Sequence, residues 1–336
     1  MWAWKPPYKL PFDMMSPMAT KQNSTLTLSR RAARLDGAAL AAEIKREVAA
    51  EVINFTQTNN RRPCLAAVRV GDDPASEVYV RNKIRACDEV GIGSEHHALS
   101  GSTSASELLD LVKSLNTRDE VDGILVQMPL PGGIDEASII DSVDPEKDVD
   151  GFHPINVGRL AIGRPVFVPC TPAGVLELLK RNKIPISGAS ACVVGRSQIV
   201  GHPTAELLLQ NNATVTICHS RTQDLKSVTR QADILVVAIG RPGFIGRDHI
   251  KPGAAVIDVG MNKVTDGEAA IELFGEDAER RLSVIKKRGY TLVGDVHPSQ
   301  ADQIAGARSP VPGGVGLLTV AMLMRNTLKA AKMRTG

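Results

Sequence analysis

The sequence predicts an α/β protein of two domains, the second of which contains a doubly wound parallel sheet. Three observations lead to this fold class. The chain has 336 residues, which is enough for two hydrophobic cores. Short apolar segments rich in valine alternate with longer amphipathic segments. One apolar segment, ACVVG, runs through a glycine turn into a helical segment, as in Rossmann-like nucleotide-binding domains.

The predicted first domain spans residues 35–168. Residues 36–55 predict a helix with one apolar face, and the valine-rich run CLAAVRVG predicts a buried strand. The same patterns predict a helix within residues 76–92, a strand near residues 96–100, a helix over residues 104–116 with the capping box Ser104–Glu107, a strand over residues 123–127 and a helix over residues 134–143. Residues 144–159 are rich in turn formers and are predicted to be a loop.

The predicted second domain spans residues 169–316. Thr171 is predicted to cap a helix that has Pro172 at its first position. Strands and helices then alternate: strands are expected at residues 191–195, 214–220, 233–240 and 254–260, with helices at residues 203–210 and 224–232. This alternation predicts a parallel sheet with right-handed crossovers. A charged helical insertion is expected on the surface between Thr265 and Tyr290.

The last predicted helix, within residues 317–336, has no strand after it, and we expect it to return to the first domain. Residues 1–34 contain Lys, Arg, Ser and Thr but only one acid, Asp13, a composition typical of a mitochondrial transit peptide. The alternatives are a disordered extension or an upstream start codon, and the prolines at positions 6, 7 and 11 disfavour an amphipathic helix there. The expected location is therefore mitochondrial or cytoplasmic.

Composition argues against several other classes of function. A formal net charge of +3 and 3% aromatic residues give no reason to expect a nucleic-acid surface. No apolar run approaches the roughly 20 residues that span a bilayer, so no membrane partner is expected. The five cysteines lack CxxC spacing and are expected to be reduced thiols. The adjacent His96 and His97 would point to opposite sides of a strand, so no metal is expected.

The nucleotide turn carries the signals for cofactor choice. Gly195 and Gly201 do not match G-x-G-x-x-G, although strand, turn and helix follow in the required order. The next strand ends without the acid that usually holds the ribose hydroxyls of NAD. The basic and hydroxyl side chains near both strand ends could instead hold a 2′-phosphate, which favours NADP; they are Arg196, Ser197, Ser220 and Arg221. The alternative is that they are solvated turn residues.

Tyr79 and Lys83 are four residues apart and therefore share one face of the predicted helix. A phenol beside an ammonium group can orient a substrate and move a proton. The spacing alone favours an ordinary surface pair.

Longer motifs favour the catalytic interpretation of Tyr79 and Lys83 over the ordinary surface pair. From Leu35 to the end, the chain resembles bifunctional methylenetetrahydrofolate dehydrogenase/cyclohydrolases. The resemblance rests on these segments, in this order: YVRNK, ILVQMPLP, EKDVDGFHPINVGR, PCTPAGVLELL, VVGRSQIVGHP, ADILVVAIG, KPGAAVIDVGMN, GDV and PVPGGVG. It implies oxidation of 5,10-methylenetetrahydrofolate with NADP and hydrolysis of the methenyl product to 10-formyltetrahydrofolate. It also implies a homodimer, and an active cleft between the two domains.

The resemblance assigns roles to matching residues. Lys83 matches the catalytic lysine, Tyr79 the tyrosine that orients folate, Gln127 the partner of the lysine and Asp150 the acid that pairs with the pterin. Cofactor contacts are implied for Gly195, Arg196, Ser197, Ser220 and Met261. Substrate contacts are implied for Val126, Met128, Pro312, Gly313, Gly314, Val315 and Gly316. Otherwise, Gln127 would be a strand-end polar residue and Asp150 a turn former.

The chain departs from the family pattern at Leu317, which follows PGGVG where the family usually has proline. Competing functions fit less well. Short-chain dehydrogenases also use Tyr-x-x-x-Lys, but there the glycine turn precedes the pair. The retained Lys83, together with Gln127 and Asp150, argues against a dehydrogenase without cyclohydrolase activity. A catalytically silent folate-binding or scaffold protein would be expected to have lost Lys83 or the GRS turn, and this chain retains both.

Overall fold

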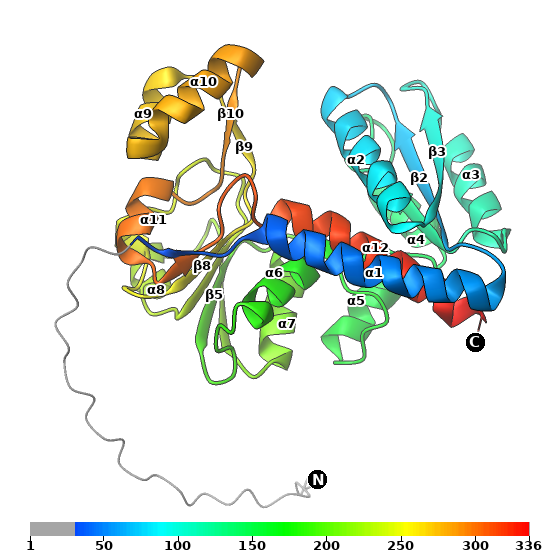
Figure 1. The fold of residues 1–336 in the computed structure, drawn as a ribbon, viewed down its shortest axis with the longest axis horizontal. Coiled ribbons are helices and arrows are strands. Elements are labelled where there is room, and N and C mark those ends of the chain that lie inside the picture. The colour runs from blue at the N-terminus through cyan, green and yellow to red at the C-terminus, as the bar shows by residue number, and fades with distance from the viewer. Residues whose placement is uncertain (1–30, 336) are drawn as a thin grey trace, which may run out of the picture. The chain divides into compact units, whose positions relative to one another are not determined.

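Two parallel sheets organise residues 31–335, the part of the chain that the computed structural model describes (Figure 1). The α/β class predicted from the sequence is confirmed. The predicted targeting signal lies mostly within residues 1–30, outside the described residues. Within residues 31–335, no helix combines the length and the apolar character needed to cross a membrane.

The first domain contains a parallel three-stranded sheet with its longest apolar strand, β2 (Cys64–Val70), in the centre. Its neighbours are β3 (Gly93–Leu99) and β4 (Gly123–Val126). The helices of this domain are α1 (Gly37–Asn59), α2 (Pro74–Val90), α3 (Ala105–Thr117) and α4 (Glu136–Ser142). The capping box of Ser104 and Glu107 at the start of α3 is confirmed.

The loop predicted over residues 144–159 is partly wrong, because α5 (Pro154–Ala161) lies within it. Pro154 occupies the first turn, where its missing N–H costs nothing. The Nδ1 atom of His153 accepts a hydrogen bond from the main-chain N–H of Ile155 at 3.1 Å and so caps the helix. Turn-forming residues here mark a helix start rather than a continuous loop.

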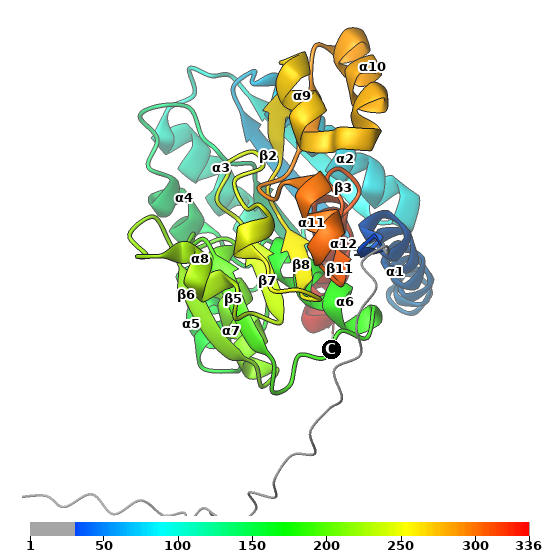
Figure 2. The ribbon, with the colours of Figure 1, turned by 90° about the vertical axis from the view of Figure 1, so that its left-hand side faces the viewer.

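The second sheet has six strands in the order β1-β11-β8-β7-β5-β6, and all its pairs are parallel (Figure 2). The strands are β1 (Ala33–Arg34), β5 (Ser190–Val194), β6 (Thr214–Cys218), β7 (Ile234–Val237), β8 (Ala255–Asp258) and β11 (Ala307–Arg308). All residues of β7 and β8 are buried, as expected for strands covered on both faces. Strand β1 falls in the segment that the sequence analysis assigned to the N-terminal extension.

The helices that connect these strands include α6 (Cys170–Arg181), α7 (Gly201–Gln210), α8 (Leu225–Thr229), the short 3₁₀ helix η1 (Arg247–His249) and α11 (Pro298–Ile304). The predicted cap at Thr171 is wrong. Helix α6 begins at Cys170 without a side-chain cap. The hydroxyl of Thr171 instead lies 2.8 Å from that of Thr319, which links α6 to the C-terminal helix.

The charged insertion between Thr265 and Tyr290 is helical, as predicted, and it lies at the tip of a β-hairpin that the sequence analysis did not predict. The antiparallel hairpin strands are β9 (Asn262–Val264) and β10 (Thr291–Val293). Between them lie α9 (Gly267–Phe274), the 3₁₀ turn η2 (Gly275–Asp277) and α10 (Ala278–Arg288). The insertion has a small core of its own, formed by Val264, Ala270, Phe274, Ala278 and Val293.

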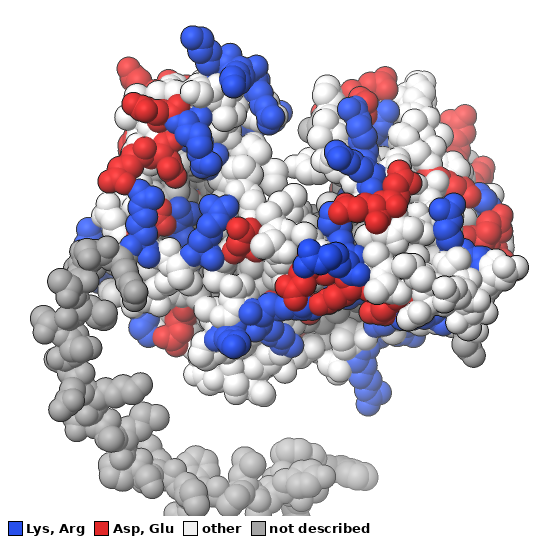
Figure 3. Space-filling model, in the orientation of Figure 1, with Lys and Arg blue, Asp and Glu red and all other residues white. Residues whose placement is uncertain are grey.

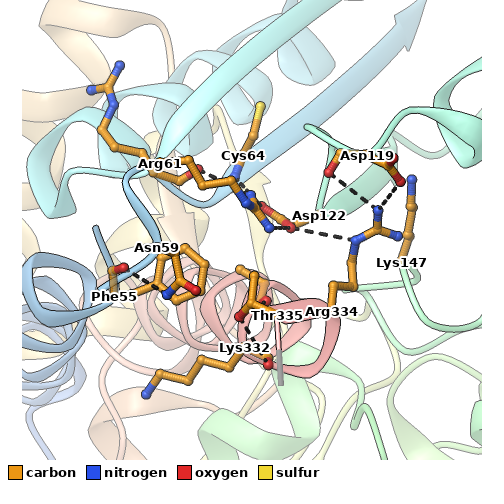
Figure 4. A network of polar contacts seen from close by, with 12 residues as sticks. Phe55, Asn59, Arg61, Cys64, Asp119, Asp122, Lys147, Lys332, Arg334 and Thr335 are labelled. Carbon is orange, nitrogen blue, oxygen red and sulfur yellow. Dashed lines mark hydrogen bonds and ion pairs between the residues drawn. The ribbon is translucent and has the colours of Figure 1, made fainter. Parts of the chain in front are cut away.

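The C-terminal helix α12 (Val315–Thr335) packs along α1 and α6. A buried carboxylate ties its end to the first domain (Figure 4). Asp122 accepts both terminal N–H groups of Arg61, at 2.8 and 2.7 Å, and the main-chain N–H of Cys64 at 2.9 Å. Arg334 lies 3.7 Å from the same carboxylate and 3.2 Å from the exposed Asp119. The last turn of α12 is thereby held against the start of β2.

Candidate active site

Lys83 and Gln127 form the central pair of the candidate site. The Nζ atom of Lys83, on α2, donates a 3.0 Å hydrogen bond to Oε1 of Gln127, at the end of β4. The amide of Gln127 is itself fixed, because its Nε2 donates to the Met128 carbonyl at 2.7 Å and its main chain pairs with Val68 at 2.8 Å. Both side chains are half-buried. The pair is therefore held in place and still accessible to a ligand.

Tyr79 lies one turn before Lys83 on α2 and connects the two domains. Its hydroxyl lies 3.3 Å from Sδ of Met261, just before β9. Tyr79 is 45% exposed and Met261 is 43% exposed, so both retain free surface for a ligand. Figure 3 shows a hollow between the surface over α2 and the surface over β9 and β10. Tyr79 comes from α2 and Met261 from the residue before β9, so their contact joins the two elements.

Asp150 is half-buried beside the lysine pair. Burial raises the pKa of Asp150, and the positive charge of Lys83 opposes this rise. Its Oδ1 atom lies 3.9 Å from Sγ of Cys170. A carboxyl group in this setting suits pairing with a ligand that offers hydrogen-bond donors.

The sequence analysis missed two residues that position Asp150. Asp148 accepts hydrogen bonds from the main-chain N–H groups of Gly151, at 3.1 Å, and His153, at 2.8 Å, and so fixes the turn around Asp150. Asn326, buried on α12, donates to the carbonyls of Val149 at 2.8 Å and Val168 at 3.1 Å. Two aspartates in one turn could have indicated that Asp148 has a structural role. A single Asn in an apolar helix could not have indicated the role of Asn326.

The nucleotide turn follows β5. Gly195 has φ +129°, and a Cβ there would lie 2.2 Å from the Ala238 carbonyl oxygen, so only glycine fits. The hydroxyl of Ser197 accepts hydrogen bonds from the N–H groups of Val200 and Gly201, both at 3.2 Å. Ser197 thereby shapes the turn that leads into α7.

The predicted phosphate-binding residues are exposed on neighbouring strand ends. Arg196 follows β5, while Ser220 and Arg221 follow β6, which ends without an acid. Neither Arg196 nor Arg221 forms an ion pair with a carboxylate within residues 31–335. Uncompensated guanidinium groups beside a helix start fit a phosphate. Met261, also predicted to contact cofactor, lies against Tyr79, which is predicted to contact the substrate.

Two buried aspartates fix the ends of β7 and β8, and the sequence analysis missed both. Asp258 accepts hydrogen bonds from the N–H groups of Gly260, Asp295 and Val296, at 3.0, 2.9 and 3.0 Å. Burial raises the pKa of Asp258 to about 7, although these three donors oppose the rise. Asp295 accepts from the N–H groups of residues 239–241 at 2.6 to 3.0 Å. Together these hydrogen bonds tie the residues that follow β7 and β8 to the segment around Asp295.

The glycine loop before α12 is fixed by α1. The N–H of Ala38 donates to the Gly313 carbonyl at 3.1 Å. A Cβ on Gly37 would lie 2.2 Å from the Gly314 carbonyl oxygen, so the two backbones approach more closely than any side chain allows. Helix α12 begins at Val315 and continues through Leu317, which is 47% exposed, so leucine is accommodated where the family usually has proline.

The remaining predicted substrate residues lie close to these groups in sequence. Val126 is buried at the end of β4, Met128 is half-buried, and Pro312 and Gly316 are exposed at the two ends of the glycine loop. A Cβ on Gly316 would meet Cε of Met261 at 2.8 Å. No cluster of His, Cys, Asp and Glu suited to a metal occurs in residues 31–335.

Comparison with known proteins identifies the family. The tetrahydrofolate dehydrogenase/cyclohydrolase catalytic domain matches residues 35–150, and the NAD(P)-binding domain of the same family matches residues 169–335. The chain belongs to this family. The resemblance predicted from the sequence motifs is therefore confirmed.

Individual relatives agree with this assignment. "Bifunctional protein FolD" of Koribacter versatilis is 58% identical over 302 residues, which covers 90% of this chain and 97% of the relative. Among solved structures, the FolD dehydrogenase/cyclohydrolase of Campylobacter jejuni is 43% identical with a TM-score of 0.80, covering 89% of this chain and 98% of that one. The Trypanosoma brucei dehydrogenase-cyclohydrolase, solved with NADP and inhibitor, is 38% identical with a TM-score of 0.83, covering 91% and 99%.

Proposed function

We propose that this protein oxidises 5,10-methylenetetrahydrofolate to 5,10-methenyltetrahydrofolate with NADP and then hydrolyses that product to 10-formyltetrahydrofolate, in one-carbon metabolism. The observation that carries the proposal is the 3.0 Å hydrogen bond between Lys83 and Gln127, beside Tyr79 and facing Met261. Family membership and the names of the relatives support both activities.

The oxidation depends chiefly on positioning. NADP, when bound, supplies the acceptor for the hydride that leaves the methylene carbon. The two folate nitrogens that flank this carbon stabilise the resulting cation, so no side chain has to transfer a proton. Tyr79 offers an exposed ring against which the folate can pack, and Asp150 offers a carboxyl group to its pterin donors.

The hydrolysis requires proton transfer. Water adds to the methenyl carbon, one proton leaves the water, and opening of the ring leaves a formyl group on one nitrogen and a hydrogen on the other. Lys83 is suited to accept the first proton, because its amine is half-buried and held in place by Gln127. Oε1 of Gln127 accepts a hydrogen bond from this amine at 3.0 Å and can keep it after the proton has been transferred. The overall reaction consumes one water and releases one proton.

The residues of the nucleotide turn fit NADP better than NAD. Ser197 and Gly195 shape a turn at the start of α7 that suits a pyrophosphate. Arg196, Ser220 and Arg221 offer charge and hydrogen bonds to a 2′-phosphate, and the end of β6 lacks the acid that would repel it.

The proposed activity can be tested one step at a time. Methenyltetrahydrofolate supplied without nicotinamide should be hydrolysed far faster with the protein than in buffer alone. A rate equal to that of buffer would contradict the role given to Lys83 and Gln127.

We also propose a homodimer, which the resemblance implies. Light scattering during gel filtration should give the mass of two chains, and the mass of one chain would contradict this.

A further inference from the structure

The helical insertion builds a cavity that the proposed reaction does not use. The cavity has a volume of about 310 Å³ and lies among α10, β10, α11 and the segment that leads into the glycine loop. Tyr79, Lys83, Gln127, Asp150 and the nucleotide turn do not line it. Pro312 is the only residue of the predicted site that does. The cavity is therefore separate from the catalytic groups but shares a wall with the substrate loop.

The lining of this cavity is strongly basic. Five arginines face two aspartates, which leaves an excess of three positive charges: Arg34, Arg280, Arg281, Arg288 and Arg308 against Asp277 and Asp302. Asp302 is already engaged by Arg308 through two paired N–H groups. Within residues 31–335, Arg280, Arg281 and Arg288 form no ion pair. Figure 3 shows basic side chains over α10 on this face of the molecule.

Among the three arginines of α10 in this lining, Arg281 is half-buried, whereas Arg280 and Arg288 are exposed. The Arg281 guanidinium lies 4.3 Å from the centre of the Phe274 ring and donates to the Val311 carbonyl at 3.1 Å. Its buried Nε atom has no hydrogen-bond partner within the described residues. Burial and the charges of Arg280, Arg308 and Arg34 lower the pKa of Arg281. The fold thus holds the Arg281 guanidinium among like charges and leaves one of its N–H donors unused. A bound anion would offset this charge repulsion.

We propose that this arginine pocket, lined by Arg280, Arg281 and Arg288, binds a compact anion that carries at least two acidic oxygens. Phosphate and polycarboxylate groups have this chemistry, and planar guanidinium groups recognise both. Such an anion has two sources, a free small molecule or the acidic glutamate tail of the folate substrate. The second source rests on the proposed function, and the first does not.

Binding in the arginine pocket would reach the substrate loop through two arginines of the lining, Arg281 and Arg34. Arg281 holds the carbonyl of Val311, and the glycine loop begins one residue later at Pro312. The guanidinium of Arg34, also in the lining, lies beside Gly313: a Cβ there would be 3.4 Å from its Nη2 atom. An anion between these arginines would therefore steady the loop as well as neutralise the charge.

The test uses two double variants of α10. Arg280→Gln with Arg288→Gln removes two exposed, unpaired members of the lining, so the fold should be retained. Lys286→Gln with Lys287→Gln is the matched control, since it removes two exposed charges of the same helix that do not line the cavity. Inorganic phosphate is titrated by calorimetry into NADP-saturated protein at constant ionic strength. The KM is then measured for methylenetetrahydrofolate with one or three glutamates.

We expect the arginine variant to bind phosphate at least tenfold more weakly than the parent, with the lysine variant unchanged. If the substrate tail is the source, the KM of the triglutamate form rises at least fivefold in the arginine variant only, and phosphate competes with that substrate. If a free anion is the source, phosphate binds without such competition. Equal phosphate affinities and equal KM values in the two variants would overturn the proposal, whether or not the protein is a dehydrogenase.

Discussion

Replacement of Lys83 by methionine separates the two proposed reactions. Methionine keeps the length and apolar stem of lysine but cannot accept a proton. Among residues 31–335 the lysine amine has one hydrogen-bond partner, Gln127 at 3.0 Å, and both side chains are half-buried. Water can reach the amide that loses its partner, so the variant should lose only about 0.5–1.5 kcal/mol of stability.

The two activities of Lys83→Met should fall by very different amounts. Loss of a general base lowers a rate by roughly 10²- to 10⁴-fold, which is the expected loss for methenyltetrahydrofolate hydrolysis. Hydride transfer moves no proton to the lysine, so the dehydrogenase rate should fall by about tenfold at most, the equivalent of one hydrogen bond. NADP affinity should be unchanged.

The assay follows each reaction separately on the purified variant, with folding checked by circular dichroism. Lys113→Met is the control, because Lys113 is an exposed lysine on α3, 68% exposed, with only a 3.7 Å contact to Asp110. It should retain both activities. Hydrolysis at the parental rate by Lys83→Met would refute the assignment of Lys83 as the base, and an equal loss of both activities would point to a positioning role instead.

Other regions give further predictions. Arg196→Ala with Ser220→Asp removes about 1.5–3 kcal/mol of charge-assisted contact, so the NADP to NAD ratio of kcat/KM should fall by roughly 10- to 150-fold; an unchanged ratio would disprove the phosphate pocket. Asp122→Ala leaves the Arg61 guanidinium without its carboxylate partner, so the free energy of unfolding measured in urea should fall by about 3–5 kcal/mol. Asp119→Ala removes a fully exposed carboxylate and should leave the urea unfolding curve unchanged, and similar losses in the two variants would argue against the buried network. Folded Asp258 keeps its proton up to about pH 7, whereas the unfolded chain releases it near 3.8. Parental stability should therefore fall by about 1.4 kcal/mol from pH 5 to pH 6 relative to Asp258→Asn, and parallel pH profiles would contradict the raised pKa.

Much of the fold could be predicted because strand and helix periodicities are local properties of the sequence. Buried runs such as ILVV, in β7, and the capping box of α3 follow directly from short-range patterns. Strands β1 and β11 have two residues each and are too short to give any pattern. Their pairing depends on tertiary contacts alone, which is why Ala33 and Arg34 were assigned to the extension.

The candidate site also contains residues that the sequence could predict and residues that it could not. Lys83 and Gln127 belong to recognisable motifs, and the fold brings them within 3.0 Å although 44 residues separate them. Asp258 and Asp295 lie in motifs too, yet their role is to hold main-chain N–H groups, which no residue pattern specifies. Asn326 reaches the turn around Asp150 only because α12 folds back over the first domain. Long-range supporting contacts of this kind require coordinates.

The most direct test of the central claim is a two-wavelength assay of the purified parental protein. Methylenetetrahydrofolate is supplied with NADP or NAD, and reduced nicotinamide and methenyltetrahydrofolate are followed separately. If one site performs both reactions, reduced NADP should appear with little accumulation of the methenyl compound. Methenyltetrahydrofolate that accumulates in step with reduced cofactor would contradict this, leaving a dehydrogenase in which Tyr79 and Lys83 only hold the folate.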